Sequence, residues 1–301
     1  MGAGGTGGYY GGRLAVAGEE VTFIARGEHL RAIQAHGLRV KSPSGDFTAR
    51  APATDDPRTV GPVDLVLFCV KSFDTESAAE AIRPLVGPGT AVLSLQNGVD
   101  NEEALGRILG PERVLGGAAY IMATIEAPGV IRHEWGGRVA FGEMDRSRSD
   151  RCARLLATLQ GAKIDAEWSD DMRRTLWEKY CFICALAGLT ALTRLPIGAI
   201  RDCPESWDLF RRVLEEAVAV GRAAGAPLAP DSVERFLAQG QGVAPGTYSS
   251  LHYDLTHGKR LELEALHGHL VRLGERLGVP TPACFAIYAA LKPYLNGRVP
   301  A

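Results

Sequence analysis

Residues 1–8 read MGAGGTGG, and they place glycines in the spacing Gly2-x-Gly4-x-x-Gly7. In a strand–turn–helix unit the first glycine of this pattern permits a tight turn, and the second lets a pyrophosphate approach the backbone. The third allows close packing of the following helix, whose N-terminal N–H groups then face the phosphates. A glycine-rich N-terminus is also common in flexible segments, so the interpretation depends on the residues that follow.

Those residues supply the rest of a mononucleotide-binding half. Residues 9–17 predict a helix, Gly18 ends it, and residues 21–25 (VTFIA) predict a short apolar strand. Turn, helix and strand in this order favour a dinucleotide-binding fold over a flexible tail. The phosphate-binding residues would be Gly2, Gly4, Gly5, Thr6 and Gly7.

A turn of this kind normally follows a buried hydrophobic strand, and the sequence shows none before Met1. Either residues upstream of Met1 supply the strand, which we favour, or the fold has lost it; whether Met1 is the biological start stays open. Without the strand, two neighbours in a parallel sheet would be unpaired around an apolar groove. We therefore expect poor solubility unless upstream residues are present.

Arg26 ends the second predicted strand, where enzymes that prefer NAD usually carry Asp or Glu for the ribose 2′-hydroxyl. A guanidinium instead matches a 2′-phosphate in geometry and in charge. Glu28 lies past the strand end and would begin the next helix. Arg26 therefore favours NADP(H), with an ordinary surface arginine as the alternative.

Composition narrows the class of protein. The 301 residues favour two domains, and a net charge of −2 gives no electrostatic case for nucleic acid or an anionic membrane. No stretch approaches the ~20 apolar residues of a membrane span, and no signal peptide opens the chain. Six cysteines lie scattered, mostly in apolar runs, which indicates reduced thiols and a cytoplasmic location. Cys181 and Cys184 spell CxxC inside an apolar helix, so we expect core packing rather than redox or metal chemistry.

The hydrophobic pattern changes its period near residue 145. Residues 1–165 predict a Rossmann-type doubly wound parallel sheet whose first strand is truncated, with strands over 63–70, 91–95, 113–122, 129–133 and 137–142 and helices over 28–36, 74–85, 101–109 and 148–160. Residues 166–301 predict an all-helical domain, with helices over 171–188, 204–225, 230–239, 247–276 and 282–293. The Gly/Gln/Pro-rich segment 239–246 is either a mobile loop beside a cleft or a plain linker.

Three polar side chains stand out as candidate site residues. Lys71 and Asn97 follow two buried strands, at the edge where ligands of parallel α/β sheets bind. Lys179 has apolar neighbours at −3, +3, +4 and +7 on its predicted helix. Facing a cleft, it would have a lowered pKa and act in proton transfer; alternatively it extends to solvent and pairs with Glu178 or Asp171.

Two histidine pairs do not support other classes of site. His267 and His269 lie two apart on a helix and diverge, so we expect no metal site. His252 and His257 lie near Ser250, but no nucleophile elbow or third member indicates a hydrolase.

Over nearly its whole length the chain resembles the ketopantoate reductase (2-dehydropantoate 2-reductase) family. The matching stretches, in family order, are GAGGTGGYYGGRLA, FIARGEHL, FCVKSFD, LSLQNGVDNEEAL, WEKY with LTAL, YSSLHYDL with GKRLELE, and LGVPTP. The resemblance implies reduction of 2-dehydropantoate to pantoate with NADPH, on the pantothenate route to coenzyme A.

The resemblance also implies residue roles. Lys179 would be the general acid, and Glu262, also near the cofactor, would orient the substrate and the lysine. Ser250 would bind the substrate carboxylate, while Lys71 and Asn97 would position both cofactor and substrate. These roles suit the chemistry, because hydride attack on a ketone builds charge on oxygen that a nearby cation stabilises.

The chain departs from the family pattern on the lysine helix. The family usually carries asparagines one and two turns after the lysine, whereas this chain has Ile183 and Ala187. An apolar pocket discriminates poorly for a hydroxyl, so a more apolar 2-oxo acid is the alternative substrate. The third alternative is a catalytically idle protein that binds or senses NADP(H). The presence of Lys179, Ser250 and Glu262 argues against it.

Helical second domains often pair with a second copy of the chain, so a homodimer is compatible with the sequence.

Overall fold

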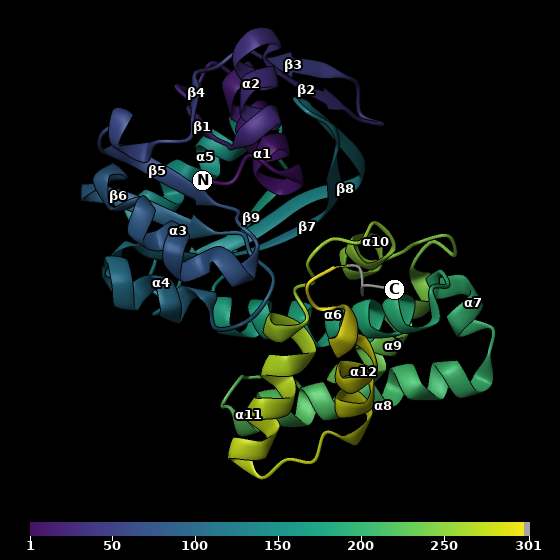
Figure 1. Ribbon diagram of the computed structural model, residues 1–301. Helices are drawn as coiled ribbons and strands as arrows, with labels where there is room; N and C mark the ends of the chain where they lie inside the picture. Colours follow the sequence, from purple (N-terminus) through teal and green to yellow (C-terminus); the bar gives the residue numbers. More distant parts are fainter. Residues whose placement is uncertain (298–301) are drawn as a thin grey trace. The chain divides into compact units, whose positions relative to one another are not determined.

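The computed structural model describes residues 1–297 as two compact units (Figure 1). The first contains Met1–Gln96 and Asp100–Thr175, and the second contains Asn97–Val99 and the chain from Leu176 onward. The boundary lies later than the expected 165/166, because residues 166–168 form a strand that pairs with the sheet of the first unit. Each unit is described by itself below.

The strands of the first unit form two sheets. The larger has the order β3-β2-β8-β7-β6-β5 with β9 beside β8, and the smaller joins β1 to β4 in parallel. The bounds are β1 (Phe23–Ile24), β2 (Leu38–Lys41), β3 (Phe47–Ala49), β4 (Ala53–Thr54), β5 (Val63–Phe68), β6 (Val86–Ser94), β7 (Val114–Ala127), β8 (Val130–Glu143) and β9 (Ala166–Trp168).

The predicted Rossmann-type fold class is confirmed, with one departure. β5, β6 and β7 are parallel, as continuous apolar runs predict, whereas β7 and β8 form a long antiparallel hairpin. The two short strands predicted over 129–133 and 137–142 are a single strand, β8. The hairpin dominates the sheet in Figure 1.

The helices of the first unit cover both faces of the larger sheet. One hydrophobic cluster lies under α1, α2 and α5, and the other lies under α3 and α4. The bounds are α1 (Gly5–Val16), α2 (Gly27–His36), α3 (Thr75–Ala81), α4 (Asn101–Leu109) and α5 (Asp150–Gly161), with 3₁₀ turns at Pro57–Thr59, Ser72–Asp74, Arg83–Leu85 and Pro111–Arg113.

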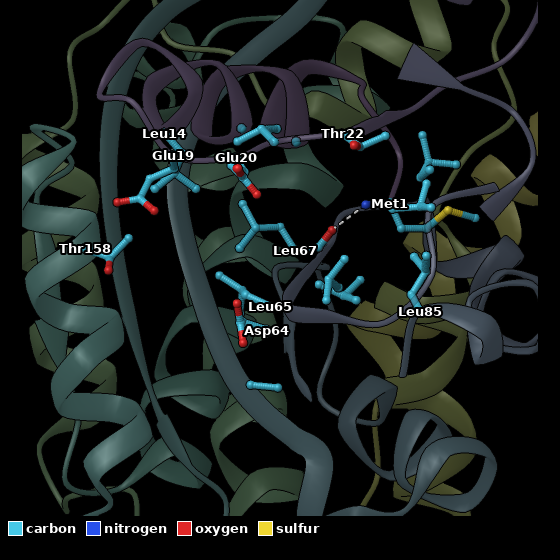
Figure 2. A pocket seen from close by; sticks show the side chains of 18 of the residues that line it. Met1, Leu14, Glu19, Glu20, Thr22, Asp64, Leu65, Leu67, Leu85 and Thr158 are labelled. Atoms are coloured by element: carbon cyan, nitrogen blue, oxygen red, sulfur yellow. Dashed lines mark hydrogen bonds between the residues drawn. The ribbon is translucent and has the colours of Figure 1, made fainter. Parts of the chain in front are cut away.

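The first residues of the chain lie between the two sheets. The Met1 nitrogen donates to the Leu67 carbonyl at 2.8 Å, and the Cys69 N–H donates to the Met1 carbonyl at 2.9 Å. On the other side the Gly2 N–H donates to the Ile24 carbonyl at 3.2 Å. The first residues of the chain therefore form hydrogen bonds with the end of β5 on one side and with β1 on the other. β1 and β5 belong to separate sheets, with a groove between them (Figure 2).

The second unit is helical throughout its described residues. Its elements are α6 (Met172–Thr193), whose first turn belongs to the first unit, α7 (Ile197–Arg201), α8 (Pro204–Ala223), α9 (Ser232–Gly242), α10 (Ser250–Thr256), a π-helical turn (Glu264–Gly268), α11 (His269–Leu277), α12 (Pro282–Leu291) and a 3₁₀ turn (Lys292–Tyr294). No helix within residues 1–297 has the length and apolar character of a membrane span.

Two expectations for this unit are wrong. The single helix over 247–276 is three elements, because Gly258 in the left-handed region (φ 62°) ends α10 and a π turn precedes α11. The segment 239–246 is helical up to Gly242. Arg201 holds the end of α9, donating to the carbonyls of Gly240 (3.3 Å), Gln241 (2.7 Å) and Val243 (3.0 Å).

Candidate active site

Different structural features explain why the positions of the first turn are glycine. Gly2 has φ 86°, and a Cβ on Gly7 would lie 2.2 Å from the Gly2 carbonyl oxygen. A Cβ on Gly5 would lie 1.8 Å from the carbonyl oxygen of Ala123 on β7. A Cβ on Gly4 would meet no protein atom within 4 Å. Three glycines are therefore required by the fold, while Gly4 borders open space.

The N-terminus of α1 can receive an anion. Gly4 is its N-cap residue and offers no side chain to the first N–H groups, and the first turn carries no acidic residue. The half-buried Thr6 lies in that turn. Exposed N–H groups and the positive end of the helix dipole favour a phosphate. Together with the space at Gly4, these residues fit the pyrophosphate of a dinucleotide.

His29 fixes the carbonyl in the middle of the turn, a role that the sequence analysis missed. Its Nδ1 accepts the Gly129 N–H at 3.0 Å, so its Nε2 carries the proton that is donated to the Ala3 carbonyl at 2.8 Å. Burial lowers the pKa of His29, which keeps the ring neutral. Gly129 lies 100 residues away in the sequence, so local pattern gave no signal for this role.

Arg26 is placed as predicted. It follows β1, caps the start of α2 and is exposed. Glu28 lies in the first turn of α2 and forms an ion pair with Arg31 at 3.9 Å. Within residues 1–297, Arg26 itself forms no ion pair, so its guanidinium is available to a ligand.

Lys71 and Asn97 follow β5 and β6 as expected, and both are half-buried. The loops that carry them are joined by Gln96, whose Nε2 donates to the Val70 carbonyl at 3.0 Å and to the Thr75 hydroxyl at 2.8 Å. The sequence analysis missed Gln96 and Thr75. A buried amide directly before Asn97 was the available signal.

Lys179 lies half-buried on α6 among buried neighbours: Leu176, Phe182 and Leu186. The two carboxylates proposed as its solvent-side partners bind arginines. Glu178 pairs with Arg235 at 3.4 Å, and Asp171 pairs with Arg146 at 2.9 Å. Lys179 therefore lies on a helix face whose neighbouring side chains are buried and apolar, and its role as the general acid stays a prediction.

The two positions that depart from the family pattern remain apolar in three dimensions. Ile183 is half-buried against the core of the second unit, and Ala187 is 4% exposed. Spacings of four and eight residues put both on the face of α6 that carries Lys179. No hydrogen-bonding side chain stands at either position.

The adjacent serines at the start of α10 have different environments. Ser249 caps the helix, accepting the His252 N–H at 3.1 Å and the Thr190 hydroxyl at 2.7 Å. Ser250 is the first helical residue and is half-buried, which leaves it as the candidate for a ligand. Glu262 is 7% exposed in the segment before the π turn.

The remaining candidates belong to the core. Cys181 and Cys184 are fully buried, and burial raises the pKa of each thiol, so the predicted core packing is confirmed. The His267 Nε2 donates to the Cys184 carbonyl at 2.9 Å, and burial lowers the pKa of His267 to about 4. His269 packs edge-on against Tyr180. Within residues 1–297 no cluster of three His, Cys, Asp or Glu side chains is arranged for a metal.

A dinucleotide-binding type of α/β unit followed by a helical unit defines the class of protein, and comparisons with known proteins give the family. The family model described as "Ketopantoate reductase PanE/ApbA" matches residues 1–146, and the model of its C-terminal part matches residues 171–295. A 2-dehydropantoate 2-reductase of Mesorhizobium japonicum is 32% identical, covering 97% of this chain and 95% of the relative. The chain belongs to the ketopantoate reductase family and is an oxidoreductase.

Solved structures of known proteins have the same fold. A PanE/ApbA family ketopantoate reductase from Ralstonia eutropha is 39% identical with a TM-score of 0.90, covering 98% of this chain and 96% of that one. A 2-dehydropantoate 2-reductase from Geobacter metallireducens is 34% identical with a TM-score of 0.90, covering 97% of each chain. A D-mandelate dehydrogenase with NADH and anilino(oxo)acetate shares the fold at 22% identity, with a TM-score of 0.89 over 97% of this chain and 96% of that one.

Proposed function

We propose that the protein reduces 2-dehydropantoate to pantoate with NADPH, the reaction that supplies pantoate for coenzyme A. One observation carries the proposal beyond the family assignment. Lys179 is half-buried among apolar side chains, and no other charged residue follows it on α6. An ammonium on this face can stabilise the negative charge that builds on the carbonyl oxygen of a bound 2-oxo acid, and it can donate a proton to that oxygen.

The cofactor proposal rests on the first unit. The α1 N-terminus and the open side of Gly4 receive the pyrophosphate. Arg26 follows β1, is exposed and forms no ion pair within the described residues 1–297. It receives a 2′-phosphate, which favours NADPH over NADH. When bound, the nicotinamide supplies the hydride.

The protein residues supply charge, geometry and a proton. Lys179 donates a proton from Nζ to the carbonyl oxygen, which becomes negative as the C–H bond forms at the carbonyl carbon. Glu262 orients the ammonium and the substrate, and Ser250 binds the substrate carboxylate. Lys71 and Asn97 position the reactants. These roles come from the resemblance and from the residue chemistry.

The test is NADPH consumption with 2-dehydropantoate, followed by absorbance. We expect turnover with NADPH to exceed turnover with NADH, and Lys179→Ala to lower kcat by about a hundredfold or more. Arg174→Ala is the matched control, because it removes an exposed cation from the same helix and should leave kcat unchanged. Undiminished turnover in Lys179→Ala would exclude the lysine as the acid.

A separate observation supports a second candidate function, the reduction of a more apolar 2-oxo acid. The apolar residues Ile183 and Ala187 favour a 2-oxo acid with an apolar side chain rather than a hydroxyl-bearing one. A panel of branched and aromatic 2-oxo acids distinguishes the two, since kcat/KM would then be highest for an apolar member. Cofactor binding without turnover of any 2-oxo acid would instead identify a sensor.

A further inference from the structure

Two hydrogen bonds join α6 to the π-helical turn of the second unit. The Tyr180 hydroxyl donates to the Leu266 carbonyl at 2.6 Å, and the His267 Nε2 donates to the Cys184 carbonyl at 2.9 Å. All four residues are buried, so water does not compete for either bond. The two bonds lie one helical turn apart on α6 and at consecutive residues of the π turn. Together they keep α6 from sliding or rotating against that turn.

The π turn contains one residue more than an α-helical turn would. The Leu266 N–H donates to the Glu262 carbonyl at 3.2 Å, the spacing of an α-helix, whereas the Gly268 N–H donates to the Leu263 carbonyl at 2.9 Å, one residue further back. The extra residue rotates the preceding chain by about 100° about the helix axis relative to α11, which follows the turn (Figure 1). The position of Glu262 therefore depends on this turn being maintained.

A short path of bonds leads from Lys179 to Glu262. Lys179 directly precedes Tyr180 on α6, and the carbonyl that accepts the Tyr180 hydroxyl belongs to Leu266. The N–H of Leu266 in turn donates to the carbonyl of Glu262. The bond of His267 meets α6 one turn further from Lys179. Tyr180 is therefore the nearer of these two links between the lysine and the glutamate.

We propose that Tyr180 is a positioning residue that holds the carboxylate of Glu262 in place relative to the ammonium of Lys179. It acts through its bond to the Leu266 backbone and not by contact with the substrate. This role rests on the proposed function, in which Glu262 orients Lys179 and the substrate. Such placement matters because a displacement of about 1 Å can lower a catalytic rate about a hundredfold.

The hydroxyl of Tyr180 can be removed without losing the packing of its ring. The ring packs edge-on against Trp177 at a centroid distance of 5.4 Å and against His269 at 6.2 Å, and phenylalanine would keep both contacts. The Leu266 carbonyl also accepts the N–H of His269, so it retains a partner when the hydroxyl is absent. Tyr180→Phe should therefore fold, with a Tm within about 5 °C of the unaltered chain.

The experiment is a double-mutant cycle that measures kcat with NADPH and the 2-oxo acid that the chain reduces fastest. Tyr180→Phe should lower kcat about tenfold or more in the unaltered chain. In a Glu262→Gln chain the same substitution should lower kcat less than about twofold, because the carboxylate that Tyr180 positions is already absent. General weakening of the second unit would lower kcat equally in both backgrounds. Tyr180→4-aminophenylalanine, whose amine can still donate to the Leu266 carbonyl, should restore most of the lost kcat.

Tyr288→Phe is the matched control from the same turn. The Tyr288 hydroxyl donates to the carboxylate of Glu264, the first residue of the π turn, at 2.9 Å. That carboxylate also accepts Arg272 at 2.6 Å and Lys292, so the loss of one phenol leaves the turn anchored. We therefore expect kcat to be unchanged in this variant.

Different outcomes contradict this role and the proposed function. An equal loss of kcat in both backgrounds, or no loss in Tyr180→Phe while Lys179→Ala is inactive, would overturn the positioning role alone. A loss in Tyr288→Phe as large as that in Tyr180→Phe would also overturn it. Undiminished turnover in Lys179→Ala, or no turnover of any 2-oxo acid, would overturn the proposed function and this role with it.

Discussion

Among the glycines of the first turn, Gly4 alone borders open space on its Cβ side while already having backbone angles that alanine tolerates (φ −75°, ψ −158°). The Gly4→Ala variant should therefore fold normally but obstruct the pyrophosphate. We expect an unchanged Tm and a Kd for NADPH raised about tenfold or more, measured by fluorescence titration.

Gly5→Ala is the contrasting variant, because its Cβ would collide with the Ala123 carbonyl. It should lower Tm as well as affinity, since the backbone has to move. Equal Tm losses in the two variants would mean that Gly4 serves the fold, and an unaltered Kd in Gly4→Ala would remove it from the cofactor site.

The apolar pair on α6 gives a prediction about substrate choice. Ile183→Asn together with Ala187→Asn should raise kcat/KM for 2-dehydropantoate about tenfold or more, because amides at these positions can bind the substrate hydroxyl. Turnover of an apolar 2-oxo acid should fall in the same variant. Leu192→Asn, an exposed change on the same helix, is the control. No gain with 2-dehydropantoate would refute the role of these positions.

Candidate site residues could be named from the sequence where a residue's chemistry conflicts with the local pattern. A lysine on an apolar helix face singled out Lys179, and polar residues after buried strands singled out Lys71 and Asn97. His29 and Gln96 escaped notice because their partners, Gly129 and Val70, become neighbours only in the folded chain. Local pattern does not report such distant hydrogen bonds.

At the scale of elements, α6 and the π turn pack closely because residue 188 is glycine. A Cβ there would lie 2.5 Å from Nε2 of the fully buried His267. Gly188→Ala should displace the ring, weaken its bond to the Cys184 carbonyl and destabilise the second unit by about 1–3 kcal/mol. Thermal unfolding measures this effect.

Gly161→Ala is the matched control, since it is also a helical glycine and a Cβ there meets no atom within 4 Å. It should leave Tm unchanged or raise it slightly, because alanine favours the helix. A Tm loss of equal size in both variants would argue against the steric explanation.

The same scale shows how far pattern alone predicts the fold. Apolar runs located β5 and the second half of β6, because strands buried on both faces lack polar residues, but β6 begins at Val86, earlier than the predicted residue 91. The end of α10 was missed although Gly258 signals it: the Lys259 N–H donates to the Asp254 carbonyl at 2.8 Å, as at a glycine-capped helix end. The antiparallel pairing of β7 with β8 depends on tertiary register, which periodicity does not contain.

For the whole molecule, we expect the free energy of unfolding to fall as the pH is lowered. Burial is the largest cause lowering the pKa of histidines in both units, His29 and His133 in the first and His252 and His267 in the second. A histidine with a lowered folded pKa stabilises the fold above its unfolded pKa, and this stabilisation is lost as pH falls through that value toward the folded pKa. For His267, with a folded pKa of about 4, the loss amounts to about 3 kcal/mol between about pH 6.5 and pH 4.

Urea unfolding at a series of pH values measures this dependence. His267→Gln should flatten the slope over the same range, because the amide can still donate to the Cys184 carbonyl but does not titrate. The comparison uses slopes rather than absolute stabilities, so a general weakening of the variant does not obscure it. An unaltered slope would show that His267 is not the group responsible.

The cap that Arg201 provides also shapes how this chain can diverge over evolutionary time. It recognises the carbonyls of Gly240, Gln241 and Val243, which every amino acid possesses, and no side chain. Substitutions at the exposed Gln241 and the half-buried Val243 should accumulate with little selection against them, whereas a Cβ on Gly240 would lie 2.8 Å from the Trp207 ring. An insertion or deletion would shift the three carbonyls away from the guanidinium. The length of the segment should therefore stay constant while the residues at positions 241 and 243 vary, and Arg201 should change only when that length changes.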